Sequence, residues 1–446
     1  MKHILVYILK LTTALVLVIL FAACNRSYEP VFGEDPDDRL RAALLQYNAT
    51  LQEAPFGWKA VLETGAGVNY FYYFNFHDDG TVTMVSDFNA STAGVAGSGT
   101  WSLKALQRPT LSFDTYSYIH LPADPDGNVN GGTNGQGLIS DFEFAFARTT
   151  DDTLYLDGVQ HGSHITFTKA TEPEATVLQA GVMQNMLQYI SANTGLRMVV
   201  DNNTVTLAFD LASRSMAAQG LSADGRQVEV HHSAYTFTTE GIRLAAPLNL
   251  YGKSITGFLW DAGEGTYTTA GAIAAGVENA DDLYLFEPSV PLYTIIGTDY
   301  STVQIPQGSG DAPLPGQSDD FIQGYNEAAT SLWQGEYRLV LNEMNFVFQP
   351  AGNTMLLDVY VTQGTTRFLC EFNYTYTIDE NGTLKFIFNN ANDSAWVIYG
   401  SLYGALLRYL EEDTFKAAYV GGGYDLTAGF FSQESTLFSF SGYLLP

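Results

Sequence analysis

Three stretches of the chain place apolar residues at the spacing of one helix face. Two of them have Met183, Met186, Leu187 and Ile190, and Phe321, Tyr325, Ala328 and Leu332. The first has Leu40, Leu44, Tyr47 and Leu51, with Asp37 ahead of them as a candidate N-cap. The spacing predicts three amphipathic helices, widely separated along the chain.

After each predicted helix, the pattern changes to apolar residues at every second position, which is typical of strands with one buried face. In three places an aromatic strand runs into an acidic residue and a glycine, and a second alternating strand follows. The pairs are 72–76 with 82–84, 235–237 with 242–244, and 374–376 with 384–388. A short acid-glycine connection between two such strands predicts a β-hairpin.

The repeated order of helix and hairpin predicts three related modules, and Tyr251-Gly252 against Tyr399-Gly400 extends the match between the second and third. We expect a mainly β protein with a few helices, made of repeated antiparallel β modules that are each opened by one amphipathic helix. The expected modules are 37–172, 173–290 and 318–446, with a Pro/Gly-rich linker at 291–317. We expect barrel-like or sandwich sheets, because hairpin-rich modules must protect their edge strands.

Residues 1–23 have the form of a lipoprotein signal peptide. A basic start at Lys2 precedes an apolar stretch, and two alanines stand immediately before Cys24. These features are typical of a secretory signal, and the cysteine predicts that Cys24 becomes the lipidated first mature residue. One transmembrane anchor is the alternative, although the apolar stretch is short and Lys10 interrupts it. Residues 24–36 are polar and partly acidic, and we expect them to form a tether.

The negative charge of the mature chain limits the classes of molecule that it is expected to bind. Removal of Lys2 and Lys10 with the signal leaves 18 basic against 48 acidic groups, a formal charge of −30. Such a field repels phosphate backbones, so nucleic acid is not an expected partner. Charged residues are only 15 % of the chain and aromatic residues are 13 %, which is more typical of an extracytoplasmic β-protein than of a cytosolic enzyme.

Asp141 and Glu143 are the candidates for a catalytic pair of carboxylates. In a strand they would share one face, about 7 Å apart, with Phe142 and Phe144 on the other face. That separation is within the range of an inverting glycosidase. An ordinary half-exposed strand shows the same pattern and is the alternative. The sequence contains no Gly-x-Ser-x-Gly, no phosphate loop of the Walker type and no His-Glu-x-x-His.

Asp124, Asp126, Asn128 and Asn130 alternate in a glycine-rich loop and are candidate ligands for calcium. The EF-hand pattern fails, because Val129 stands where that motif has its glycine. Loops rich in Asp, Asn and Gly are also common as plain turns, so the alternative is a loop without an ion.

The histidines and the remaining cysteine predict no metal or nucleophile site. The pairs His161 with His164 and His231 with His232 have no third ligand nearby in the sequence, so no zinc site is expected. Cys370 lies on the apolar face of an alternating strand, which indicates a buried thiol rather than a reactive one.

The tryptophans are spread over all three modules. An exposed tryptophan or tyrosine can stack on the apolar face of a sugar, while Asn and Asp bind its hydroxyls. We expect most of the tryptophans to lie in the core, because the aromatic strands alternate as a packed face requires. They are Trp58, Trp101, Trp260, Trp333 and Trp396.

With these residues in view, the chain resembles a family of Bacteroidota lipoproteins known as domain of unknown function 4302. Such proteins are typically encoded near outer-membrane transporter pairs of the starch-utilisation type. The resemblance therefore implies an accessory role in nutrient capture at the cell surface, and it brings no catalytic residues. It rests on Cys24, the acidic tether with Phe32 and Arg39, Gly57-Trp58, residues 137–144 and 235–244, Gly252-Lys253 and Phe258.

Together these observations predict a lipoprotein of the outer membrane that faces the cell exterior. We expect a non-enzymatic accessory protein that binds a nutrient, glycan first and peptide second, beside an outer-membrane transporter. Two other hypotheses stay open: a secreted hydrolase with an unrecognised acidic site, and a structural partner of another envelope protein.

Overall fold

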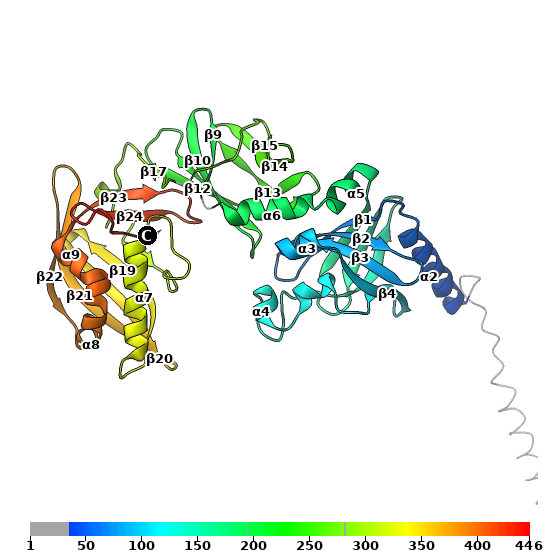
Figure 1. The fold of residues 1–446 in the computed structure, drawn as a ribbon, viewed down its shortest axis with the longest axis horizontal. Helices are drawn as coiled ribbons and strands as arrows, with labels where there is room; N and C mark the ends of the chain where they lie inside the picture. The colour runs from blue at the N-terminus through cyan, green and yellow to red at the C-terminus, as the bar shows by residue number, and fades with distance from the viewer. Residues whose placement is uncertain (1–34, 194, 281) are drawn as a thin grey trace, which may run out of the picture.

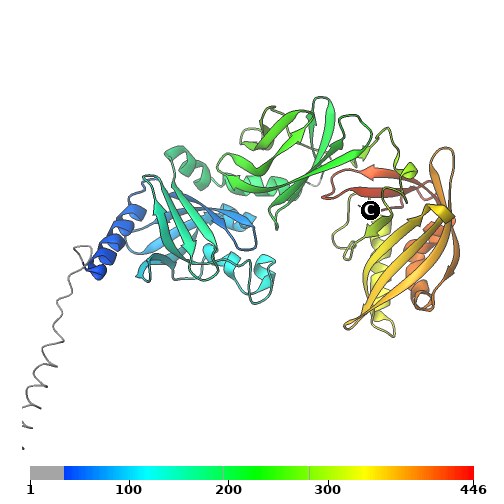
Figure 2. The same ribbon diagram turned by 180° about the vertical axis from the view of Figure 1, so that it is seen from behind.

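The structure is a computed structural model that describes residues 35–446, with the exception of 194 and 281. The predicted signal, Cys24 and nearly all of the tether lie outside the described residues. The described chain is mainly antiparallel β with a few helices, as predicted, and its strands form three rings that follow one another along the sequence (Figure 1). The view from behind shows the same succession (Figure 2).

The first ring is a closed barrel of eight strands in sequence order. Each strand is antiparallel to the next, and β8 pairs back with β1 from Trp58↔Lys169 to Glu63↔His164. The strands are β1 (Trp58–Glu63), β2 (Asn69–Phe76), β3 (Thr81–Ser86), β4 (Gly97–Ala105), β5 (Pro109–Phe113), β6 (Glu143–Thr149), β7 (Thr153–Gly158) and β8 (His164–Lys169). The short helices α3 (Ala90–Gly94), η1 (Tyr118–Ala123) and α4 (Gly127–Asn130) lie in its loops.

The first predicted hairpin is β2 with β3. Tyr72, Phe74 and Phe76 belong to the core of the first barrel, which accounts for their alternation. Phe71 and Tyr73 point the other way and are nevertheless buried, because they join the hydrophobic cluster of the second ring and the helices that precede it. Strand β2 is therefore covered on both faces and connects the first two rings.

The second ring closes through a split strand. Strand β15 (Thr266–Gly271) is bridged on its free edge by Thr268↔Gly276, and Val277 donates a backbone hydrogen bond of 2.8 Å to Tyr267. The same segment continues as β16 (Glu278–Asn279), which pairs with β9 (Leu196–Val200). The intervening strands are β10 (Asn203–Asp210), β11 (Ser215–Leu221), β12 (Val228–Thr238), β13 (Gly241–Leu250) and β14 (Lys253–Asp261). The second predicted hairpin is β12 with β13.

In the third ring, each strand from β18 to β25 pairs with its successor, and β25 pairs with β18. The pairing between β23 and β24 completes the ring, while β17 adds to β23 from outside. The third predicted hairpin is β21 with β22. The strands are β17 (Leu285–Phe286), β18 (Thr302–Ile305), β19 (Val340–Gln349), β20 (Thr354–Gln363), β21 (Thr366–Ile378), β22 (Thr383–Ala391), β23 (Thr414–Val420), β24 (Thr427–Ser432) and β25 (Ser439–Leu445).

The predicted helices are present, with two differences. Helix α2 (Pro36–Gln52) is capped by Asp35, whose carboxylate accepts a hydrogen bond of 2.9 Å from the backbone of Asp37, so the predicted cap, Asp37, is two residues too late. The second ring is preceded by two helices rather than one, α5 (Glu172–Gln179) and α6 (Val182–Ala192). Gly181 between them has a φ of 75°, which interrupts the helical path and caps α6.

Helix α7 (Asp319–Gln334) buries the predicted face of Phe321, Tyr325, Ala328 and Leu332. A second helical segment of the third ring was not predicted. It consists of α8 (Asp393–Leu402), the π-helical turn η4 (Tyr403–Leu407) and α9 (Arg408–Glu412). No described helix is long and apolar enough to cross a membrane.

The segment 291–317, expected as a linker, forms part of the third ring. Its residues 302–305 are strand β18, which lies between β19 and β25. Val303 and Ile305 are fully buried in the third core, and this burial holds the segment in the sheet. The third ring therefore begins before α7, and the helix follows its first strand.

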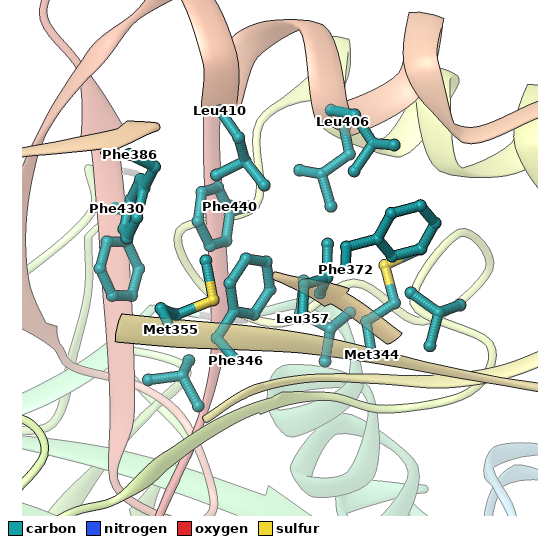
Figure 3. Close-up of a cluster of buried hydrophobic side chains, with 14 of the residues drawn as sticks. Met344, Phe346, Met355, Leu357, Phe372, Phe386, Leu406, Leu410, Phe430 and Phe440 are labelled. Carbon is teal, nitrogen blue, oxygen red and sulfur yellow. The ribbon is translucent and has the colours of Figure 1, made fainter. Parts of the chain in front are cut away.

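The interior of the third ring is filled with side chains. Figure 3 shows strand residues such as Phe346, Leu357 and Phe440 packed together, with Leu406 and Leu410 of the helical segment on one side of them. The rings of Phe346 and Phe440 are stacked, with centroids 5.0 Å apart. The barrel interior is thus a packed core, and candidate sites have to be sought on its outside.

Candidate functional site

Asp141 is a buried structural carboxylate. It lies in the loop before β6, so the predicted strand position of Asp141 is wrong. Its Oδ1 accepts hydrogen bonds from the backbone of Gln160 at 2.7 Å and of His161 at 2.9 Å. Its Oδ2 accepts 2.7 Å from the Ser163 hydroxyl and 3.2 Å from the Ser163 backbone. The carboxylate therefore holds the loop between β7 and β8 and has little capacity left for a substrate.

Glu143 is the first residue of β6, and its surroundings differ from those of Asp141. Its Oε1 lies 2.6 Å from Lys104 Nζ and accepts a hydrogen bond of 3.1 Å from the Ser112 hydroxyl. The two carboxylates thus face different partners and do not converge on a common point.

The side chains of the candidate calcium ligands also form hydrogen bonds within their own loop. Asp124 accepts hydrogen bonds from the Tyr116 hydroxyl and the Asp126 backbone, and Asp126 accepts two from Asn128 as the cap of α4. Asn130 turns its amide nitrogen toward the backbone oxygens of residues 121, 122 and 124. The loop has the hydrogen bonds of a chain of turns, with carboxylates and amides pointing at backbone groups.

The histidines are dispersed. His164 lies 3.2 Å from Asp157, His231 lies 3.7 Å from Glu229, and the ring of His232 packs near Tyr424. Among the described residues, no group of three or more His, Cys, Asp or Glu side chains is placed to hold a metal.

Cys370 is a buried core thiol, as predicted. Burial raises the pKa of this thiol to about 11, which keeps it protonated and unreactive at neutral pH.

The tryptophans separate into buried and exposed residues. Trp58 and Trp101 belong to the core of the first barrel, and Trp260 is half-buried against the second. Trp333 and Trp396 are 53 % and 52 % exposed, and both belong to helices of the third ring. The prediction that most tryptophans are buried therefore holds for the first ring, and the third ring carries the exposed pair.

Trp396 opens a row of aromatic side chains along α8. Helix α8 begins at Asp393 because the Asn392 side chain accepts a hydrogen bond of 2.8 Å from the Ala395 backbone. Trp396, Tyr399 and Tyr403 then lie at i, i+3 and i+7, which puts them on one helix face. Their ring centroids are 5.3 Å and 5.5 Å apart in order. We call these three residues the aromatic row.

The row is supported by the residues beneath it, and Trp396 is exposed while Tyr399 and Tyr403 are half-buried. Phe388 of β22 lies 5.9 Å from Trp396 and 6.0 Å from Tyr399, ring to ring, and holds both in position. Gly400 and Gly404 lie beside the row, and a Cβ at either position would meet nothing within 4 Å. A ligand can therefore approach the helix closely between the rings.

A polar group lies at the centre of the row. The Tyr399 hydroxyl donates a hydrogen bond of 3.3 Å to Glu411 Oε1. Burial, and next the charge of Glu411, raise the pKa of Tyr399, so its hydroxyl stays protonated. Burial also raises the pKa of Glu411. The row thus combines apolar ring faces with a hydroxyl and a carboxylate at its edge.

The spacing of the aromatic row is visible in the sequence. Tyr399-Gly400 matches Tyr251-Gly252 in sequence, but Tyr251-Gly252 lies in the turn between β13 and β14 and not in a helix. The helical spacing of Trp396, Tyr399 and Tyr403 was the signal that could have found the site.

Comparisons with known proteins give one family match and no curated relative. A family model described as domain of unknown function (DUF4302) matches residues 28–262, which include the first barrel and the second ring as far as β14. No curated protein matches the chain. A crystal structure from Nitrosomonas europaea, provisionally described as AttH, is 9 % identical, covers 86 % of this chain and 89 % of its own, and has a TM-score of 0.14. Similarity at that score supports no conclusion about this chain. The aromatic row lies beyond the matched residues.

Proposed function

The chain belongs to the DUF4302 family, and from this premise we propose that it is a lipid-anchored surface protein that binds an extracellular glycan without changing it. In this proposal Cys24 carries the lipid in the outer membrane, and the three rings face the cell exterior. The bound glycan is delivered to an outer-membrane transporter beside it.

The aromatic row is the observation that carries the proposal. A pyranose ring has an apolar face of C–H groups and an equator of hydroxyls. An exposed indole or phenol ring covers the apolar face, and nearby polar groups bind the hydroxyls. Trp396 and Tyr399 offer the first kind of contact, and the Tyr399 hydroxyl with Glu411 offers the second.

The geometry of the row favours a chain over a single sugar. Three rings at successive separations of 5.3 Å and 5.5 Å can each contact a different unit of an oligosaccharide. The planes of neighbouring rings are tilted by 45° and 33°, so a ligand on the row has to curve with the helix. Such a site binds with about micromolar to millimolar affinity, because few ordered contacts offset the lost freedom of the ligand.

A secreted hydrolase receives less support from the arrangement of the candidate acids. The hydrogen bonds of Asp141 and the ion pair of Glu143 occupy the carboxylates that such an enzyme would need.

A protein partner is the second candidate function, and one feature favours it. The end of the third ring near α8 has an apolar dimple of about 220 Å³. Its rim includes Tyr337, Phe368 and Val397, which are all exposed, and Cys370 lies in its floor. A large apolar side chain from another envelope protein fits a dimple of this kind.

The test compares two tryptophans of equal exposure. The soluble mature chain, with Cys24 replaced, is titrated with a panel of oligosaccharides in a calorimeter, and products are sought by mass spectrometry. We expect Trp396→Ala to weaken glycan binding at least about tenfold, or about 1.4 kcal/mol. Trp333→Ala serves as the control and should leave the affinity unchanged, since Trp333 is as exposed but lies outside the row.

Equal affinity of the wild type and Trp396→Ala would remove the aromatic row as the site. Turnover of a glycan that is lost in Glu143→Gln or Asp141→Asn would instead establish the hydrolase. If no glycan binds, the protein-partner hypothesis is the one that remains, and Phe368→Asp is the variant that tests it.

A further inference from the structure

A cavity of about 710 Å³ lies between the second and third rings. One wall is the outer face of β9 and β10, and the opposite wall consists of residues 313–317 and the glycines that follow β23. The two rings are joined beside it by hydrogen bonds: Gly422 donates 3.0 Å to the Thr206 hydroxyl, and Gln219 donates 2.9 Å to the Asp425 backbone. Its volume and its place at an interface between two bodies are typical of ligand sites.

Arg197 on β9 is the positively charged side chain in the described lining of this cavity. Its guanidinium carbon lies 5.0 Å from the centroid of the Tyr284 ring, and Nη1 lies 3.2 Å from Asp282 Oδ1. Nη2 donates to the Asp282 backbone oxygen. The ring and the backbone contact fix the guanidinium in one orientation, so little freedom remains to be lost when it binds an anion.

The two members of this ion pair differ sharply in their surroundings. The Arg197 side chain is 15 % exposed, whereas that of Asp282 is 80 % exposed. The arginine is therefore held by the protein, while the carboxylate of Asp282 rests on it from the solvent side. An exposed carboxylate in such a pair contributes little and can be exchanged for another.

Two other polar side chains of the lining already have hydrogen-bond partners. Asp210 accepts hydrogen bonds from the backbones of residues 212 and 213, and Gln317 bridges the backbones of residues 314 and 441. The remaining wall includes apolar side chains such as Leu283 and Pro313. A ligand for this cavity thus needs one anionic group that binds Arg197, and the rest of the ligand should be weakly polar.

We propose that this cavity binds a small oligomer that carries a carboxylate, and that the ligand carboxylate takes the place of Asp282 on Arg197. Arginine presents a planar fork of donors that matches a carboxylate with two parallel hydrogen bonds. This site is separate from the aromatic row and does not depend on glycan binding there. A uronic-acid sugar and the free C-terminus of a peptide share the required chemistry.

The experiment uses matched charged and neutral probes on the full mature chain. Trigalacturonate is compared with neutral galactotriose, and trialanine is compared with trialanine amide, all by calorimetry. The variants are Asp282→Asn, Arg197→Lys and Arg197→Ala, and a thermal melt of each reports on folding.

We expect binding of at least one carboxylate probe and none of its neutral counterpart. Arg197→Ala should reduce the affinity at least about tenfold, and Arg197→Lys should recover only part of it, because lysine lacks the planar fork. Asp282→Asn is the decisive variant. It removes the competing carboxylate and should raise the affinity for the same probe up to about fivefold.

Each outcome of this experiment either supports or overturns the proposal. Binding of trigalacturonate alone assigns a sugar acid, and binding of trialanine alone assigns a peptide C-terminus. Absence of binding to both charged probes, equal binding of neutral and charged probes, or an unchanged or lower affinity in Asp282→Asn would overturn the proposal. The Asp282→Asn result stands even if Arg197→Ala fails to fold. Binding to the aromatic row is read separately through Trp396→Ala.

Discussion

Arg214 and Asp87 form a buried ion pair across the boundary between the first two rings. Nη2 of Arg214 lies 3.8 Å from Asp87 Oδ1 and also donates a hydrogen bond to the Asp87 backbone oxygen. Asp87 Oδ1 accepts 2.9 Å from the Phe71 backbone, and the guanidinium carbon lies 5.2 Å from the ring centroids of Tyr70 and Phe237. The pair therefore joins β2 and the loop that follows β3 to the second ring at a point that excludes water.

Single substitutions in this pair should be far more costly than the double substitution. Arg214→Met or Asp87→Asn alone leaves the other group buried without its partner, and we expect a loss of about 3–5 kcal/mol in the free energy of unfolding. In the double variant Asp87→Asn/Arg214→Met, the loss should be clearly smaller than the sum of the two single losses. Urea unfolding of the four proteins measures the coupling, and additive losses would show that the two residues act independently.

The same pair predicts an unusual pH dependence. Burial raises the pKa of Asp87 to about 6, although Arg214 acts in the opposite direction. The folded protein thus binds this proton more tightly than the unfolded chain, whose carboxyl has an ordinary pKa of about 3.9. The contribution of Asp87 to the free energy of unfolding therefore falls as the pH rises from about 4 to about 6.

This contribution is isolated by comparison with Asp87→Asn. We expect the stability of the wild type relative to that variant to increase as the pH is lowered from 7 to 5, by an amount on the order of 1–2 kcal/mol. Denaturant unfolding at a series of pH values checks this. A difference that stays constant over this range would mean that Asp87 does not titrate there.

The hydrogen bonds of Asp141 predict a role in stability rather than in chemistry. Asp141→Ala leaves three backbone N–H groups and a hydroxyl of the β7–β8 loop without their acceptor, and should lower the free energy of unfolding by about 3 kcal/mol. Glu143→Ala is the matched control. It removes a partly exposed ion pair with Lys104 and should cost less than about 1 kcal/mol. Equal losses for the two variants would contradict this assignment.

The position of β18 predicts where the third ring can be separated from the chain. A fragment of residues 283–446 contains every strand of this ring and should unfold in one cooperative thermal transition. A fragment of residues 318–446 lacks β18, which exposes the edges of β19 and β25 and empties the places of Val303 and Ile305. Calorimetry should show no cooperative transition for the shorter fragment. A sharp transition there would mean that β18 is dispensable.

Lipidation is tested directly at its residue. Cys24→Ala removes the thiol that the lipid requires, so the variant should remain a full-length precursor that takes up no labelled palmitate in cells. Ser27→Ala, in the same predicted tether, is the control and should be labelled like the wild type. Labelling of the Cys24→Ala variant would exclude this anchor.

The elements with strong local patterns could be predicted from the sequence. The aromatic residues of β2, β12 and β21 alternate and each is followed by an acid-glycine turn, and all three hairpins are present. The helix face from Phe321 to Leu332 is likewise buried as its spacing predicts. In these segments one face contacts a core and the other faces away from it, so the burial of each residue follows its position.

The features of the fold that could not be predicted from the sequence depend on contacts between distant parts of the chain. Strand β18 has only four residues, and its burial comes from β19 and β25 on either side of it. Phe71 and Tyr73 break the alternation of β2 because the second ring covers their face. Asp141 looked like a strand residue with a free carboxylate, and only the folded loop of residues 160–163 reveals what it binds.

The candidate sites could likewise be predicted from the sequence only in part. The row of Trp396, Tyr399 and Tyr403 has a helical spacing that can be read in the sequence, but the exposure of Trp396 and the partial burial of the two tyrosines are properties of the fold. The cavity at Arg197 brings together residues from 190 to 422, which no local pattern connects.

The order of the strands also has a consequence for the rate at which each ring is completed. In the first ring, seven of the eight pairings join strands that are consecutive in the sequence, and β1 with β8 is the exception. Most consecutive pairings close short loops, with β5 and β6 as the exception, whereas Trp58 has to find Lys169 across the whole length of the barrel. Pairing of consecutive strands is therefore expected to be fast, and pairing of β1 with β8 is expected to limit the rate of folding. During synthesis, each barrel remains an open sheet with two unpaired edges until its final strand has been made, and in this interval the chain is most exposed to association with its neighbours.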